Sequence, residues 1–140
     1  MHIVNKKAHF NFQLEPERIE AGISLLGAEA RAIRENRASI NEATVRIQNG
    51  EAYLINANIP ATGLTNYNAT QVRKLLLHHH EIVNLETRAK QQKLTLVPLK
   101  IYTKGRLAKL ELALGKPKRQ FEKRAVIKAR QAERELKLEL

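Results

Sequence analysis

The 140-residue chain contains no cysteine, which excludes a disulfide framework, a thiolate zinc site and a cysteine nucleophile. Its two serines, Ser24 and Ser39, do not lie in a G-x-S-x-G nucleophile motif. Glycine-rich phosphate-binding loops are missing as well. Because these features carry much of covalent and nucleotide-dependent chemistry, we expect a protein that is not an enzyme and needs no cofactor.

Long apolar runs are also missing. No run approaches the roughly 18 residues of a transmembrane helix, and the first ten residues lack the apolar core of a secretory signal. We therefore expect a cytoplasmic protein. The consecutive histidines His78, His79 and His80 are not a metal motif, because neighbouring residues on a helix point about 100° apart. A tetrahedral site needs converging ligands, so we expect no bound metal.

Positive charge, by contrast, is abundant. The net charge is +11, of which residues 1–114 carry +6 and residues 115–140 carry +5. This distribution favours a nucleic acid over a purely protein partner. A membrane surface is the alternative for a basic tail, but the tail contains a single aromatic residue, Phe121. We therefore expect no membrane partner.

Hydrophobic alternation predicts short strands, mostly antiparallel, that are interrupted by two helices. We expect six strands, at residues 9–14, 20–26, 44–48, 51–55, 95–102 and 106–114. The helices are expected at residues 29–34 and 78–93. Six short strands of this kind usually close into a barrel, which removes the sheet edges. The predicted fold is mainly β: a small six-stranded antiparallel β-barrel over residues 1–114 with two or three helices.

Three local signals make this prediction specific. Asn49-Gly50 between β-prone runs is the strongest short hairpin signal, and it pairs Val45 with Leu54 on one face. Asn36 is suited to a left-handed helix cap. Pro98 cannot donate a ladder hydrogen bond, so it predicts an edge or a bulge.

Residues 115–140 form a basic C-terminal tail with a helical but mostly alanine stripe. Like-charge pairs such as Arg119 and Lys123 lie four residues apart, which weakens a helix. Isolated helices are marginal even without such repulsion. We expect a tail that is disordered or fraying when free and helical against phosphate. A permanently docked C-terminal helix is the alternative, because the apolar stripe exists.

Basic residues also recur in the first part of the chain, at Lys6-Lys7, at Arg31, Arg34 and Arg37, and at Arg73-Lys74. Each group alone is compatible with a solvated surface. Together with a small barrel they favour RNA or DNA binding. With three Phe, three Tyr and no Trp, the chain is poor in platforms for stacking bases. Recognition of folded RNA by its shape and backbone fits better.

At this point a family resemblance emerges from motifs in a defined order along the chain. The motifs are Asn5–Ala8 (NKKA), Glu20–Gly22 (EAG), Gly27–Glu29 with Arg34, Asn49–Ala52 (NGEA), Arg73–His78 (RKLLLH), Thr95–Tyr102 (TLVPLKIY), and Gly115-Lys116 followed by Glu122–Arg124. By this ordered set, nearly the whole chain resembles the SsrA-binding proteins (small protein B) of bacterial trans-translation.

The resemblance implies an oligonucleotide-binding-like barrel and an RNA-binding adaptor. Such an adaptor binds the tRNA-like domain of transfer-messenger RNA and delivers it to stalled ribosomes. Its tail occupies the empty mRNA path near the decoding region of the small subunit. We expect a monomer. A generic basic ribosome-associated or nucleic-acid-binding structural protein is the alternative.

The resemblance also assigns residues to these two tasks. The expected RNA-binding residues are Asn5, Lys6, Lys7, Glu20, Glu29, Arg31, Arg34, Arg73 and Lys74. The expected ribosome-binding residues of the tail are Lys116, Lys118, Arg119, Glu122, Lys123, Arg124, Lys128 and Arg130.

Overall fold

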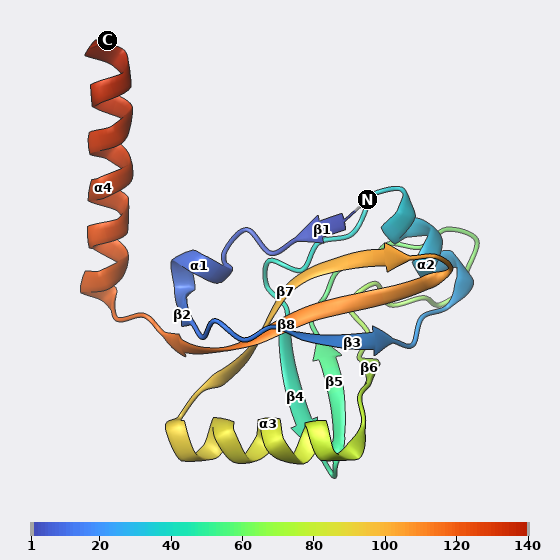
Figure 1. Cartoon of the computed structure of the whole chain (residues 1–140). Coiled ribbons are helices and arrows are strands. Elements are labelled where there is room, and N and C mark those ends of the chain that lie inside the picture. Colours follow the sequence, from blue (N-terminus) through green and yellow to red (C-terminus); the bar gives the residue numbers. More distant parts are fainter. Residues whose placement is uncertain (1, 140) are drawn as a thin grey trace.

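The computed structural model describes the backbone of residues 2–139, and the side chains in that range except those of residues 2, 120–122, 126 and 137–139. This part of the chain forms one eight-stranded sheet and four helices (Figure 1). The elements are β1 (His2–Val4), α1 (Ala8–Asn11), β2 (Phe12–Leu14), β3 (Ile19–Ile23), α2 (Gly27–Arg34), β4 (Thr44–Gln48), β5 (Glu51–Ile55), β6 (Arg73–Leu76), α3 (His79–Gln92), β7 (Thr95–Lys104), β8 (Leu107–Pro117) and α4 (Gln120–Glu139).

The strands pair in the order β1-β7-β8-β3-β6-β5-β4, and β2 pairs with the end of β8. Every pairing of these strands is antiparallel. The hydrogen-bonded order does not return to β1 within the described residues, so the sheet is a curled half-barrel. The prediction of a mainly antiparallel β fold is confirmed.

The predicted strand count of six is wrong, because β1 and β6 were missed. β1 has only three residues, which is too short for an alternating pattern. β6 does alternate between buried and exposed side chains, but Arg73 is one of its buried members, so hydrophobicity did not reveal it. The strand expected at residues 9–14 is also partly wrong. Ala8–Asn11 form one helical turn, and the extended segment begins at Phe12.

The local signals are confirmed. In the β4–β5 hairpin Val45 faces Leu54, and Asn49 and Gly50 have φ angles of 53° and 76°. The ladder between β7 and β8 changes register just after Pro98. After α2, Asn36 has a φ of 59°, and its N–H donates to Ile33 O over 3.0 Å. This is the left-handed cap that the sequence indicated.

The core lies between the concave side of the curled sheet and the helices α2 and α3. Its fully buried members include Ile33 of α2 and Leu54, Leu75, Ile101 and Leu110 of the sheet. The helix α3 contributes Ile82 and Leu85. Burial of these apolar side chains supplies the main driving force for folding, and it leaves the alternate side chains of each strand on the outer face.

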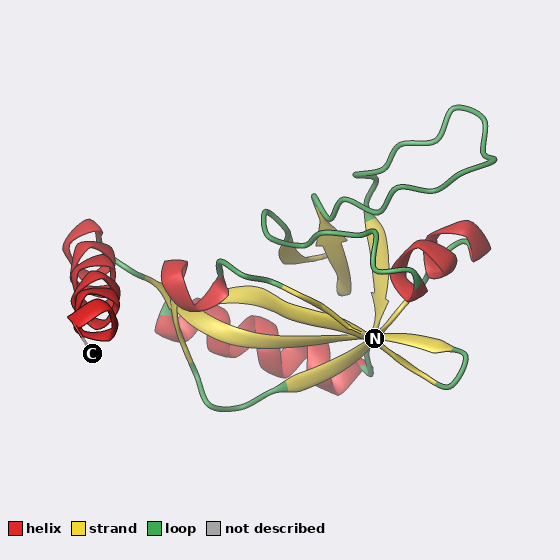
Figure 2. Ribbon diagram, turned by 90° about the horizontal axis from the view of Figure 1, so that it is seen from above, coloured by secondary structure: helices red, strands yellow, loops and turns green. Residues whose placement is uncertain are grey.

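The helix α4 stands clear of the sheet beside α1 (Figures 1 and 2). It contributes no described residue to the core, and Ile127 and Leu136 are more than half exposed. Within the described residues, no helix is apolar enough over a sufficient length to cross a membrane.

Candidate nucleic-acid interface

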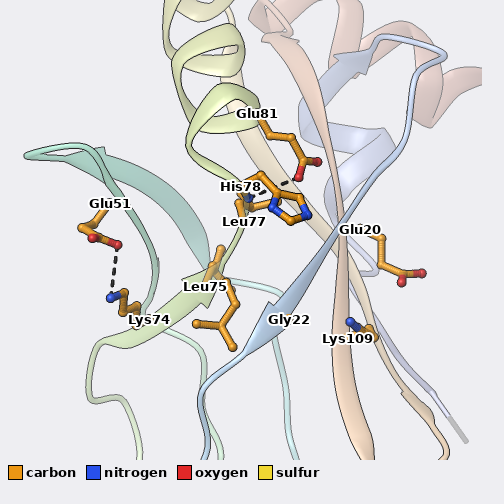
Figure 3. Close-up of a pocket in the computed structure, with 10 residues that line it drawn as sticks. Glu20, Gly22, Glu51, Lys74, Leu75, Leu77, His78, Glu81 and Lys109 are labelled. Carbon is orange, nitrogen blue, oxygen red and sulfur yellow. Dashed lines mark hydrogen bonds and ion pairs between the residues drawn. The ribbon is translucent and has the colours of Figure 1, made fainter.

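The outer face of the sheet carries an open groove of about 470 Å³ across β3, β6 and β8. Figure 3 shows the residues that line it: Glu20 and Lys109 lie on one side, and Lys74 and Glu51 lie on the other. A second hollow is continuous with this groove, since both are lined by Gly22, Leu76 and Lys109.

The groove exists because β3 and β6 pair over two residue positions only, Gly22 with Leu76 and Ile23 with Leu75. Ile23 and Leu75 point into the core, while Gly22 and Leu76 face outward. A Cβ atom at Gly22 would lie 3.3 Å from the Cβ of Leu76. The missing side chain therefore leaves a shallow apolar floor between charged neighbours.

The second hollow is mostly apolar and has basic residues at its edge. Leu107 is 61% exposed and Leu76 is 56% exposed, and Arg106 lies beside them. Ala30 of α2 also lines this hollow. Arg34 follows Ala30 by one helical turn, so it lies on the same side of α2.

The carboxylate of Glu20 sits in a positive neighbourhood. It accepts a hydrogen bond from the Tyr102 hydroxyl, and this bond, together with Lys104 and Lys109, lowers the pKa of Glu20 below its usual value of 4.5. Burial, followed by the same hydrogen bond, raises the pKa of Tyr102 to about 12. At neutral pH the pair is thus a tyrosine donor and an ionised acceptor.

Lys74 forms an exposed ion pair with Glu51. Its Nζ lies 3.3 Å from Glu51 Oε2, and both side chains are nearly half exposed. An exposed ion pair of this kind adds little to stability. Phosphate oxygens can therefore replace Glu51 as the partner of Lys74 at small cost. Together the groove offers ammonium groups for phosphates and carboxylates for ribose hydroxyls.

Two expected RNA-binding residues, Glu29 and Arg73, are instead buried against each other. Their side chains are 2% and 1% exposed, and Arg73 Nη2 lies 2.7 Å from Glu29 Oε2. Arg73 also donates to the carbonyl oxygens of Ala57 and Ala69, over 2.7 and 2.8 Å. The pair therefore ties α2 to the loop that precedes β6.

The carboxylate of Glu29 accepts further hydrogen bonds besides those from Arg73. It accepts hydrogen bonds from the Tyr67 hydroxyl, the Gln71 amide and the backbone N–H of Leu26. Burial by itself would raise the pKa of Glu29, but the bonds from Leu26, Arg73 and Tyr67 outweigh it and leave the pKa below its usual value.

Asn5 likewise faces the protein and not the solvent. It is 6% exposed, and its Nδ2 donates to Pro98 O over 2.8 Å. Its Oδ1 accepts the backbone N–H of Lys7 over 3.1 Å. The side chain thereby shapes the loop that exposes Lys6 and Lys7, and Lys7 forms an ion pair with Glu42.

The α2 arginines are exposed, and Arg31 donates to Glu35 over 2.8 Å. In the tail, Lys118 and Lys123 lie against α1. Among the expected ribosome-binding residues of the tail, those with exposed side chains are Lys116, Arg119, Arg124, Lys128 and Arg130. The side chain of Glu122 lies outside the described residues.

Sequence reasoning missed Gly22, Leu76, Arg106 and Lys109 as members of one site. The outward position of Lys109 was readable from the alternation in β8, but its neighbours come from strands that lie far apart in the chain. The expected residues Glu20 and Lys74 do meet here (Figure 3), whereas Lys6, Lys7 and the tail residues do not line this groove.

A basic, curled antiparallel sheet with an open charged groove defines a nucleic-acid-binding β-protein. The family model described as "SmpB protein" matches residues 2–140. The chain belongs to the SmpB family.

Similarity to individual known proteins supports this family membership. An SsrA-binding protein of Dehalococcoides mccartyi is 44% identical over 139 residues, which cover 97% of this chain and 80% of that protein. An SsrA-binding protein of Mesoplasma florum is 45% identical, with 95% of this chain and 93% of that protein covered. A chain of the solved structure "tmRNA-SmpB: a journey to the center of the bacterial ribosome" is 36% identical, with a TM-score of 0.69 and 85% of each chain covered.

Proposed function

We propose that this protein is an RNA-binding adaptor of trans-translation. It binds the tRNA-like domain of transfer-messenger RNA and delivers this RNA to stalled ribosomes in the cytoplasm. The observation that carries the proposal is the family match over residues 2–140, because the relatives are named for binding SsrA RNA. The solved neighbour adds the ribosome, which its description names together with tmRNA and SmpB.

The groove across β3, β6 and β8 is the proposed RNA surface. Lys74 and Lys109 line it, and Arg106 lines the adjoining second hollow. These three side chains would contact phosphates, while the floor at Gly22 and Leu76 admits the RNA backbone closely. Such contacts recognise the shape of a folded RNA and need few aromatic side chains. We interpret the curled sheet as an open form of the oligonucleotide-binding barrel.

The other expected RNA-binding residues have different proposed roles. The exposed cations Lys6, Lys7, Arg31 and Arg34 extend the phosphate-binding surface beyond the groove. Glu29, Arg73 and Asn5 are buried and support RNA binding by holding α2 and the loops in place.

The tail is the proposed ribosome-binding part. We assign residues 1–114 to the RNA-binding domain and residues 115–140 to the tail, which lies in the empty mRNA path near the decoding region. Lys116, Arg119, Arg124, Lys128 and Arg130 are exposed and suited to contact ribosomal RNA phosphates. Glu122, Lys118 and Lys123 complete the proposed tail set. The adaptor acts as a monomer.

Removing the tail is the decisive test, and the structure indicates where to cut. Residues 115–117 belong to β8 and pair with β2, so a cut at residue 114 would damage the sheet. A chain ending after Lys118 should keep its affinity for transfer-messenger RNA within about threefold, since the groove is intact, and should lose rescue of stalled ribosomes. A uniform loss of binding to all RNAs would favour the generic basic protein instead.

Specificity requires a second measurement. Gel-shift titrations at moderate salt should show preference for the tRNA-like domain over an unrelated hairpin of equal length. Equal affinity for both RNAs would contradict the proposal, because phosphate attraction alone gives no preference.

A further inference from the structure

Glu20 and Tyr102 are bonded to each other across the strand that separates them. Glu20 lies on β3 and Tyr102 lies on β7, and both strands pair with β8. In this register Glu20 is opposite Glu111, whereas Tyr102 is opposite Lys109. The hydrogen bond from the Tyr102 hydroxyl to Glu20 Oε2 therefore crosses the outer face of β8 between Glu111 and Lys109.

The carboxylate of Glu111 is engaged by cations that lie outside the groove. Its Oε2 lies 3.2 Å from Lys100 Nζ, and its Oε1 lies 3.7 Å from Arg18 Nε. Neither Lys100 nor Arg18 lines the groove. The negative charge of Glu111 is thus matched on that side of the sheet.

Lys109, by contrast, forms no ion pair with any described residue. The carboxylate best placed to pair with it belongs to Glu20, because Gly22, two residues further along the same face of β3, is opposite Lys109. Diagonal positions of this kind are about 7–8 Å apart, which long side chains can span. Glu20 and Lys109 also lie on the same side of the groove (Figure 3). The Glu20 carboxylate is nevertheless bonded to the neutral hydroxyl of Tyr102.

Tyr102 is suited to hold a carboxylate without changing the charge beside the groove. Its side chain is partly buried on the outer face of β7, and Lys100 Nζ lies 5.6 Å from the centre of its ring. Burial, followed by the bond to Glu20, raises the pKa of Tyr102 to about 12, so the hydroxyl remains a neutral donor at physiological pH. Lys109 therefore keeps a positive charge that an anion outside the protein can meet.

We propose that Tyr102 is a positioning residue that holds the Glu20 carboxylate over β8 and away from Lys109, so that Lys109 stays available for RNA phosphates. The inference rests on the proposed function of the groove. Without the hydroxyl, the carboxylate of Glu20 pairs with Lys109, and a phosphate group must displace it. The bond to Tyr102 uses one oxygen of Glu20 and leaves the other as an acceptor for a ribose hydroxyl.

Tyr102→Phe removes the hydroxyl and keeps the ring. Titration of the tRNA-like domain at several salt concentrations should show binding weakened by about threefold at low salt, because an exposed ion pair now competes with phosphate. The deficit should shrink as salt screens this pair, so log affinity falls less steeply with log salt than in the parent. Tyr53→Phe is the matched control, since it removes a hydroxyl from a partly exposed residue of β5 that does not line the groove. It should bind like the parent.

Removing the carboxylate as well gives the sharpest result. In a Glu20→Gln background, Tyr102→Phe should change neither affinity nor salt dependence, because no carboxylate remains to pair with Lys109. A direct contact between Tyr102 and the RNA, or a general loss of packing, would persist in this background and at high salt. A persistent loss in the double variant, or parent-like binding by Tyr102→Phe alone, would overturn the proposal.

Lys109→Gln separates this inference from the proposed RNA surface. A reduced salt slope in Lys109→Gln together with parent-like binding by Tyr102→Phe would leave the groove in place and remove the positioning role. An unchanged slope in Lys109→Gln would refute both. Without RNA, the ¹⁵N NMR signal of the Lys109 ammonium group reports the ion pair directly. It should shift in Tyr102→Phe and not in the Glu20→Gln background, and an unmoved signal in Tyr102→Phe would contradict the pairing.

Discussion

Arg73 and Lys74 are neighbours on β6, but one side chain is buried and the other is exposed. The side chain of Arg73 is 1% exposed and is paired with Glu29, whereas that of Lys74 is 49% exposed and lines the groove. Successive residues of a strand point to opposite faces of the sheet. The comparison teaches that the face of the strand on which a charge lies decides whether it holds the fold or is offered to a partner.

The two positions also differ in the desolvation free energy that each charge loses when the chain folds. Burying an ion pair carries a desolvation penalty that is offset only when the remaining hydrogen-bonding groups are satisfied. Among the described side chains, no buried polar atom lacks a hydrogen-bond partner. The half-exposed ammonium group of Lys74 remains hydrated, so its charge is available for a phosphate group.

The largest effect is expected from Arg73→Met. It leaves Glu29 buried without its cation and should lower the free energy of unfolding by about 3–5 kcal/mol, as is typical when a buried pair loses one member. Urea denaturation followed by circular dichroism measures this value. The matched variant Lys74→Met should change it by less than about 1 kcal/mol. Similar losses in both variants would refute the distinction between the two positions.

Acid should destabilise the protein through Glu29. Its folded-state pKa lies below the usual value of 4.5, so its contribution is fully present above pH 4.5 and is lost as the pH falls through the folded-state pKa. In Glu29→Gln the fall in stability below pH 4.5 should be shallower than in the parent. Glu86→Gln, at a partly exposed position of α3 where the carboxylate only pairs with Lys90, should keep the parent slope. Parallel curves for the parent and Glu29→Gln would argue against this role.

The groove is tested by RNA binding. Lys74→Gln and Lys109→Gln should each weaken binding to the tRNA-like domain and lower the slope of log affinity against log salt by about 1, as expected for one lost phosphate contact. Lys90→Gln on α3 serves as the control, because Lys90 is exposed but does not line the groove. An unchanged salt slope in both groove variants would place the RNA elsewhere on the protein.

The smallest effect is expected at a residue that belongs neither to the Glu29–Arg73 pair nor to the groove. Asn36 adopts a φ of 59°, which glycine tolerates better than any residue with a Cβ. Asn36→Gly should stabilise the protein by about 0.5 kcal/mol, and Asn36→Ala should destabilise it by about 1 kcal/mol. Denaturant midpoints measure both, and stabilisation by alanine would contradict the role of the left-handed cap.

Features that depend on neighbours in the chain could be predicted. The Asn49-Gly50 hairpin, the cap at Asn36 and the irregularity after Pro98 each follow from one or two residues whose backbone preferences are strong. The strand β6 could not be predicted, because its pattern includes a buried arginine. Arg73 can be buried in β6 only because Glu29, which is 44 residues away in the chain, pairs with it in the folded protein.

The candidate site was predictable as a set of residues but not as a surface. Glu20 and Lys74 were expected in RNA-binding motifs and do line the groove. Glu29, Arg73 and Asn5 were expected beside them but are buried. Local hydrophobicity cannot separate these cases, because a charged side chain is buried only when distant residues supply its partners.

By itself, the sequence determined the basic charge of both parts, the turns and caps, and the ordered motifs that mark the family. The tertiary structure decided that the sheet curls without closing, that β3 and β6 diverge at Gly22 to leave a groove, and that Lys118 meets α1. The reason is physical. Charge and turn preference belong to single residues and their neighbours, whereas burial and grooves arise from strands that meet only when the chain has folded.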